Sequence, residues 1–252
     1  MMMVSIHFLK RKGMIKLKYM GSKNRLAKDI VPIIQSYIDK GCSGYLEPFV
    51  GGANIIDKIK CDNKYGSDAH KQLIAFLNAL SNGYEPPKNI SEEEYKYIKT
   101  HQNEYDDKFL GYIGFQLSYG AMWFGTFRRD KIGKRKYDKE AYQNVMKQAP
   151  NLKGIIFKNC SFKNINHVKN YVIYCDPPYR YTTKYTTGTF PYDEFYDWCR
   201  EMSKDNVVLV SEYNMPDDFK CIWSKETKCL LSSDREPNDN KNIRVEKLWI
   251  KN

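Results

Sequence analysis

The chain has 252 residues, with 41 lysines and arginines against 30 aspartates and glutamates, which gives a formal net charge of +11. This length suits one large domain with a real core, and the charge favours a polyanionic partner such as nucleic acid, with a merely soluble basic surface as the alternative. Seven cysteines without a Cys-x-x-Cys pair argue against a disulfide framework or a zinc site, and no apolar run approaches the ~20 residues that span a bilayer. We therefore expect a cytoplasmic protein without a metal or a membrane contact, in which Met14 offers an alternative start.

The first predicted element is a helix that begins after Ser22, as N-cap, and runs to about Asp39. Lys23 lies at its start, where the helix dipole favours anions rather than cations. The pattern therefore predicts an anionic group beside Lys23, such as a ligand carboxylate, with a solvated lysine as the alternative.

A short strand that ends near Glu47 leads into a glycine turn with Phe49 and Gly51, and then into a predicted helix over residues 55–59. Glycines in such a turn let the backbone approach a ligand closely, although the spacing does not match a dinucleotide fingerprint. About 20 residues further on, a second strand ends in Asp68. An acid at that offset binds ribose hydroxyls in Rossmann-like nucleoside sites, and an N-cap of the next helix is the alternative.

A helical and basic stretch follows. Helices are expected over 91–101 and 108–123, and residues 124–139 then contain seven lysines and arginines interleaved with aromatic residues and glycines. Such a loop suits a duplex, because cations bind phosphates and guanidinium groups read base edges, whereas a solvated charged loop is the alternative. The candidates for nucleic-acid contact are Arg128, Arg129, Lys131, Lys134 and Arg135. A further helix over 141–148 is expected to end before Pro150.

A buried strand over 171–175 runs into Asp176, Pro177, Pro178 and Tyr179. The prolines end the strand, so the acid lies at its carboxyl edge on a stiff loop. A carboxylate and a proline carbonyl can together accept both hydrogens of an aromatic amine, and the tyrosine can stack on the ring that carries it. The alternative is a tight turn with an exposed acid and a packed tyrosine.

After this loop, residues 181–189 have the composition of a binding loop, and a helix over 190–204 leads to a strand over 207–210. Strands are expected over 221–231 and 243–250. The order of elements predicts an α/β fold with a mostly parallel sheet, divided into a first part over 14–101, a helical insert over 102–150 and a second part over 151–252.

Four motifs come in a recognisable order: the segment from Tyr19 to Lys23, the turn from Glu47 through Gly51, the acid Asp68, and the Asp-Pro-Pro-Tyr loop. In this order the chain resembles the DNA adenine methyltransferases of the Dam kind, the D12 class, from about Lys16 onward. The resemblance implies a Rossmann-like methyltransferase fold in which the insert over 102–150 recognises the DNA target.

The resemblance also implies a role for each matching residue. The cofactor would be S-adenosylmethionine, Asp68 would bind its ribose hydroxyls, and the loop from Asp176 to Tyr179 would hold the target amine. The place of an acid that often contacts the cofactor adenine is taken by Ser161, so this contact falls to the backbone or to Phe162. The implied cofactor-binding residues are Tyr19, Lys23, Glu47, Phe49, Gly51, Asp68, Phe162 and Asp176.

The predicted function is site-specific transfer of a methyl group to the 6-amino group of adenine in double-stranded DNA, with the base flipped out of the duplex. The alternatives are transfer to the cytosine 4-amino group, to an RNA adenine or to a glutamine side chain, and a catalytically silent DNA-binding relative. A monomer of bacterial or phage origin with a restriction endonuclease as partner completes the prediction.

Overall fold

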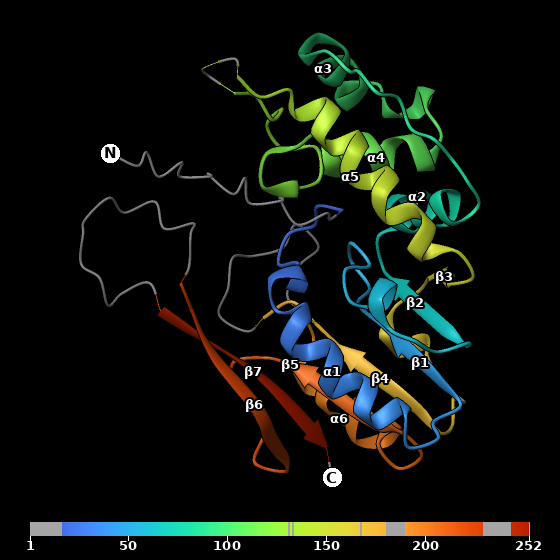
Figure 1. The fold of residues 1–252 in the computed structure, drawn as a ribbon, viewed down its shortest axis with the longest axis vertical. Coiled ribbons are helices and arrows are strands. Elements are labelled where there is room, and N and C mark those ends of the chain that lie inside the picture. The colour runs from blue at the N-terminus through green and yellow to red at the C-terminus, as the bar shows by residue number, and fades with distance from the viewer. Residues whose placement is uncertain are drawn as a thin grey trace, which may run out of the picture.

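The computed structural model describes residues 17–130, 132, 134–166, 168–179, 190–228 and 243–251. Its centre is a seven-stranded sheet of order β3-β2-β1-β4-β5-β7-β6 (Figure 1). The five strands from β3 to β5 are parallel neighbours, and β7 is antiparallel to both β5 and β6. This confirms the predicted mostly parallel α/β sheet. The strands are β1 (Gly44–Glu47), β2 (Lys64–Asp68), β3 (Ile156–Asn159), β4 (Tyr171–Cys175), β5 (Val207–Ser211), β6 (Phe219–Lys228) and β7 (Ile243–Lys251).

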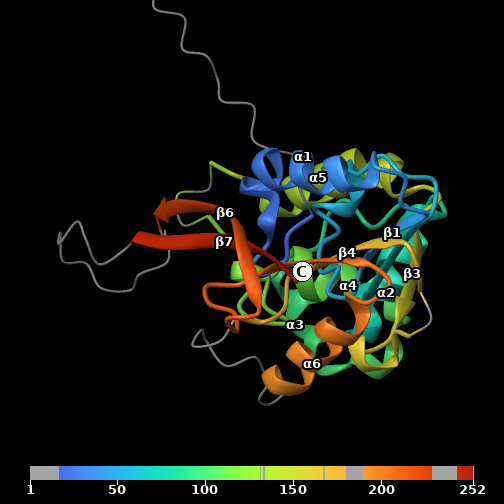
Figure 2. The same ribbon diagram turned by 90° about the horizontal axis from the view of Figure 1, so that it is seen from below.

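Helices cover both faces of the sheet. Figure 2 shows α1 and α6 on opposite sides of it, and Figure 1 shows α2 to α5 gathered at one end of the molecule, away from the β6–β7 hairpin. Among the helices found in the described ranges, none is long and apolar enough to cross a bilayer. The helices are α1 (Ala27–Ile38), α2 (Lys71–Ser81), α3 (Glu92–Thr100), α4 (Asp107–Gln116), α5 (Tyr137–Leu152) and α6 (Tyr192–Met202).

Strand β4 is buried on both faces, which explains its continuous apolar sequence. Successive side chains of a strand point to opposite faces of the sheet. Val172 and Tyr174 accordingly pack in the core cluster that contains α1, whereas Ile173 and Cys175 pack in the cluster that contains α6. The position of β4 in the middle of the sheet follows from this burial.

Three predicted helix bounds are wrong. The helix expected over 55–59 is a 3-10 turn, Ile56–Lys58. The helix expected to reach 123 ends at Gln116, because Ser118 forms an isolated bridge with Phe127 instead. The helix expected to end before Pro150 continues to Leu152, so Pro150 lies inside the last turn of α5. A proline so close to the end of a helix removes only one hydrogen bond, so the final turn persists.

Two buried glutamines join the helical part to the N-terminal motif. The Gln148 side chain of α5 accepts from the Leu17 amide at 2.7 Å and donates to the Gly52 and Ala53 carbonyls, both at 3.1 Å. The Gln116 side chain of α4 accepts from the Lys18 amide at 2.8 Å and donates to its carbonyl at 2.9 Å. Helices from the segment 102–150 therefore hold the chain that leads into the first motif, whereas the proposed boundaries of that insert stay a prediction.

Candidate active site at the carboxyl ends of β1 and β4

The two predicted ligand loops leave the sheet side by side. β1 pairs with β4 in parallel, with Leu46 opposite Ile173. β2 lies on the far side of β1 and β5 on the far side of β4, so the connections from these two strands diverge. In an open α/β sheet such a switch point leaves a crevice outside the carboxyl ends of the strands, where ligands bind. The glycine turn and the Asp-Pro-Pro-Tyr loop both begin at this crevice.

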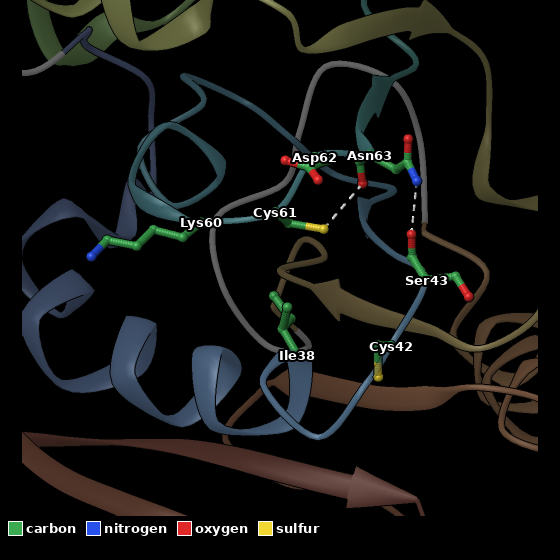
Figure 3. A pocket seen from close by; sticks show the side chains of 7 residues that line it. All are labelled: Ile38, Cys42, Ser43, Lys60, Cys61, Asp62 and Asn63. Carbon is green, nitrogen blue, oxygen red and sulfur yellow. Dashed lines mark hydrogen bonds between the residues drawn. The ribbon is translucent and has the colours of Figure 1, made fainter.

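A pocket of about 520 Å³ lies elsewhere, and Figure 3 shows the side chains that line it. Ser43 and Asn63 directly precede β1 and β2, and the Asn63 side chain donates to the Ser43 carbonyl at 2.9 Å. The pocket is therefore at the amino ends of the strands, on the opposite edge from both motifs. Its lining residues are Ile38, Cys42, Ser43, Lys60, Cys61, Asp62 and Asn63.

Lys23 forms an ion pair with Asp176. Ser22 caps the 3-10 turn Lys23–Arg25, where its hydroxyl accepts from the Asn24 amide at 3.4 Å. The Lys23 ammonium lies 3.0 Å from the Asp176 carboxylate, and only 9% of the lysine side chain is exposed. The anion expected beside Lys23 is thus the protein's own Asp176, which joins the first and last of the four motifs.

Tyr179 completes this corner. The Lys23 ammonium lies 4.2 Å from the centre of its ring, and the ring packs nearly perpendicular to that of Tyr213 at a centroid distance of 4.6 Å. The Tyr179 hydroxyl donates to the Glu246 carboxylate at 3.0 Å, and Glu246 lies 3.8 Å from the Lys23 ammonium. The ring is therefore fixed by a cation, a second aromatic ring and a hydrogen bond.

The two carboxylates of the corner favour the charged form of Lys23 and disfavour each other. Burial alone would lower the pKa of Lys23, but the carboxylates of Asp176 and Glu246 raise it above its ordinary value. Burial also raises the pKa of Asp176, with Lys23 acting in the opposite direction and Glu246 adding to the rise. Lys23 consequently stays protonated at neutral pH and occupies one oxygen of Asp176.

The two proline carbonyls of the loop differ in their hydrogen bonding over the described residues. The Tyr192 hydroxyl at the start of α6 donates to the Pro178 carbonyl at 3.0 Å. Over the residues whose placement is described, the Pro177 carbonyl has no hydrogen-bond donor. The predicted binding loop over 181–189 lies outside the described residues.

Tyr19, Gly51 and Asp68 form one continuous surface beside this corner. Gly51 has φ +47°, and a Cβ atom built on it would lie 2.7 Å from Cδ1 of the Tyr19 ring. The Gly51 amide donates to one oxygen of Asp68 at 3.2 Å, and the His70 amide donates to the other at 3.0 Å. A carboxylate has about four acceptor positions, so Asp68 keeps capacity for ligand hydroxyls.

The surroundings of Asp68 exclude one of its two predicted roles. Burial raises the pKa of Asp68 to about 6, and the backbone hydrogen bonds from His70 and Gly51 oppose that rise. The N-cap of α2 is His70, whose ring accepts from the Leu73 amide at 3.4 Å. The N-cap alternative for Asp68 is therefore wrong, and its carboxylate faces the glycine turn.

Two of the predicted cofactor residues lie in the interior. Glu47 is 3% exposed and accepts a hydrogen bond of 2.7 Å from the Tyr45 hydroxyl, and burial raises its pKa well above the ordinary range. Phe162 is 4% exposed and packs against Phe49 at a centroid distance of 5.7 Å. Glu47 is therefore an interior group, and Phe162 packs against the half-buried Phe49.

The predicted DNA-binding residues differ in their exposure and in their contacts with other protein groups. The Arg128 guanidinium lies 3.8 Å above the Tyr137 ring, and its NH1 atom is buried without a hydrogen-bond partner. Arg135 forms a two-bond ion pair with Glu140 at 2.8 and 2.7 Å, and Arg129 lies 3.6 Å from Glu92. Lys134 is exposed, and Lys131 lies outside the described residues. Among the candidates, Lys134 is exposed without an ion pair to any described residue and Arg129 is exposed beside Glu92, and Lys136 and Lys139 of the same stretch are exposed as well.

Sequence reasoning missed Glu246 and Tyr192 as members of the site. Glu246 lies on β7, 70 positions after Asp176, in a stretch whose alternation predicts only a strand. Tyr192 is one of 20 tyrosines and stands in no motif. No local signal marks either residue, because only the pairing of β7 with β5 and the start of α6 bring them to the loop.

A mostly parallel sheet of this order, with an acid-proline-proline-tyrosine loop beside a glycine turn, defines a Rossmann-like methyltransferase. The family model of the D12 class N6 adenine-specific DNA methyltransferases matches residues 19–234, and the chain belongs to this family. The chain is also similar to the Type II methyltransferase M.CviBI of Paramecium bursaria Chlorella virus NC1A, with 32% identity over 90 residues. That match covers 35% of this chain and about a third, 31%, of the viral enzyme. The predicted resemblance is confirmed.

The close approach of Tyr19 to Gly51 gives a stability prediction. Gly51→Ala adds a Cβ against the Tyr19 ring at positive φ, and we expect it to lower the free energy of unfolding by about 2–4 kcal/mol. Gly83→Ala is the matched control, because Gly83 also has positive φ but has nothing within 4 Å. It should cost only about 1 kcal/mol. Urea unfolding of both variants measures the difference, and equal losses would refute the contact.

Proposed function

We propose that the protein transfers a methyl group from S-adenosylmethionine to the exocyclic 6-amino group of adenine in duplex DNA. The family supports this chemistry, and the observation that carries it is the placement of Asp176 and Tyr179 next to the glycine turn at the switch point of the sheet. The proposal includes a DNA substrate. Four further points stay predictions: a restriction endonuclease partner, a monomeric state, a cytoplasmic location and a bacterial or phage origin.

The surface formed by Tyr19, Gly51 and Asp68 suits the nucleoside of this cofactor. Asp68 would accept the ribose hydroxyls, and the Tyr19 ring would cover the turn where Gly51 lets the backbone approach. The same surface borders Lys23, so the first motif contributes to both the cofactor side and the acceptor side. When bound, S-adenosylmethionine supplies a methyl group already activated on a sulfonium.

The loop after β4 suits the acceptor amine. Asp176 would accept one hydrogen of the amine and stabilise the positive charge that develops on it, and the open Pro177 carbonyl would accept the other. Tyr179 would stack on the base. Catalysis of this kind is mainly positioning, so the rigidity of Tyr179 and the two prolines is the relevant property.

The base must leave the duplex to reach this loop, which costs a few kcal/mol that stacking and backbone contacts offset. The helical segment 102–150 would read the target, with Arg129 and Lys134 on DNA phosphates. In this proposal Arg128 and Arg135 act first on the protein itself, since one stacks on Tyr137 and the other pairs with Glu140.

The alternatives are separable. An aspartate rather than an asparagine at position 176, together with the family, favours adenine over the cytosine 4-amino group, an RNA adenine or a glutamine side chain. Mass spectrometry of nucleosides from an expressing host distinguishes these acceptors, and modification-sensitive sequencing of its genome gives the target. A catalytically silent relative would fail to bind S-adenosylmethionine at millimolar concentration.

Asp176→Ala removes the acceptor for the amine but none of the Tyr19–Gly51–Asp68 surface. We expect the rate of methyl transfer to fall by about 10³-fold or more, while the Kd for the cofactor changes by less than about threefold. Tritiated S-adenosylmethionine with duplex DNA measures the rate, and calorimetry measures the Kd. Near-normal turnover in this variant would show that Asp176 has another role.

The pKa of Asp68, about 6, predicts a pH dependence for cofactor binding. Ribose hydroxyls donate to the charged carboxylate, so affinity should be full above that pKa and fall by about tenfold per pH unit below it. Asp68→Asn should bind the cofactor more weakly at pH 8 and show no such fall between pH 7 and 5. Calorimetry across this window checks the prediction, and an unchanged affinity in the variant would refute the ribose role.

Exposed cations predict the salt dependence of DNA binding. Arg129→Ala and Lys134→Ala should each weaken binding to all sequences alike and reduce the slope of log K against log salt by about 1. Lys60→Ala is the matched control, because Lys60 lines the pocket at the opposite edge of the sheet. Fluorescence anisotropy over a salt series measures the slopes, and equal slopes in all three variants would exclude these contacts.

A further inference from the structure

Glu246 is the member of the catalytic corner that comes from outside the matched family region. The family model ends at residue 234, and Glu246 lies beyond it on β7. Its side chain is 15% exposed, and its carboxylate reaches both Tyr179 and Lys23, at 3.0 and 3.8 Å. A carboxylate placed among these groups needs an explanation that the shared motifs do not supply.

The strand that carries Glu246 is anchored on the same helix that follows Lys23. In the β6–β7 hairpin Glu246 lies opposite Lys225, so their side chains share one face of the sheet. The Lys225 ammonium lies 2.7 Å from the Asp29 carboxylate of α1. This ion pair links the hairpin to α1, the helix that follows the turn beginning with Lys23, on the same face of the sheet as Glu246.

Lys23 already contacts both groups that the proposed function assigns to the substrate. Lys23 occupies one oxygen of Asp176 and covers the Tyr179 ring at 4.2 Å. Under the proposed function, Asp176 has to accept a hydrogen from the amine and Tyr179 has to receive the base. A carboxylate has about four acceptor positions, so Asp176 keeps room for the amine, but any turn of Asp176 toward the substrate weakens its pairing with the buried Lys23 ammonium. Glu246 is the second carboxylate within reach.

We infer that Glu246 is a positioning residue with two effects, an inference that rests on the proposed function. It receives the Lys23 ammonium when Asp176 turns to the substrate amine, and it holds the Tyr179 hydroxyl so that the ring keeps its orientation for stacking. The Glu246 carboxylate thus acts both on the freedom of Asp176 to turn and on the orientation of the Tyr179 ring. Glu246 itself touches neither the amine nor the methyl donor.

The test is single-turnover methyl transfer with the full chain, saturating tritiated S-adenosylmethionine and a DNA duplex that contains the target site in its unmethylated form. Glu246→Ala should lower the rate constant by about tenfold to a hundredfold, because both positioning contacts are lost. The Kd values for cofactor and DNA should stay within about threefold of wild type. This division between rate and affinity would not follow from a general loss of folded protein.

Two further variants separate the effects. Tyr179→Phe keeps the ring and removes the hydroxyl that donates to Glu246, whereas Lys23 keeps its second carboxylate, so this variant should lose less rate than Glu246→Ala. The double variant should be no slower than Glu246→Ala alone, since the same contact is removed twice. Glu246→Gln keeps an acceptor for the hydroxyl but removes the charge for Lys23, and its rate should lie between Glu246→Ala and wild type.

Glu226→Ala is the matched control. Glu226 is an exposed acid on β6, opposite Val245, so its side chain lies on the other face of the same hairpin. Its rate should equal that of wild type. A wild-type rate in Glu246→Ala, or in Glu246→Gln if the alanine variant does not fold, would overturn the inference. Absence of methyl transfer by the wild type would instead refute the proposed function.

Discussion

The buried ion pair between Lys23 and Asp176 is the interaction on which the site depends. Both groups lose water when the chain folds, and burial would lower the pKa of the lysine and raise that of the acid if either stood alone. Paired, each group offsets part of the burial penalty on the other, whereas Glu246 favours the charged lysine and disfavours the charged aspartate. Removing one partner from such a pair leaves an uncompensated charge, which typically costs about 3–5 kcal/mol. The pair therefore ties the turn before α1 to the end of β4.

The ion pair and its neighbours orient the side chains to which the proposed function assigns the reaction. Under the proposed function, the acid that accepts a hydrogen from the amine is oriented by an internal cation before the substrate arrives. Tyr179 is restrained in the same way, through its hydroxyl and through its packing against Tyr213. Groups that are oriented beforehand lose little freedom at the moment of reaction, which is how positioning lowers a barrier.

The cofactor side and the helical side of the molecule are joined by the same short segment. Gln116 and Gln148 bind the backbone at Leu17 and Lys18, immediately before Tyr19 packs on Gly51. Buried amides that satisfy backbone groups in this way specify one arrangement, because any other leaves polar groups unpaired. A movement of α4 or α5 would consequently reach the segment before Tyr19 through these hydrogen bonds.

The sequence by itself determined the sheet class, the four motifs, their order and the family. It did so because burial on both faces, as in β4, and the backbone limits of Pro177 and Gly51 are written in neighbouring residues. Only the tertiary structure decided that the anion beside Lys23 is Asp176, that Glu47 lies in the interior, and that His70 rather than Asp68 caps α2. It also decided that Glu246 belongs to the corner. These outcomes depend on strand order and on packing between segments far apart in the chain, and a local sequence pattern predicts neither.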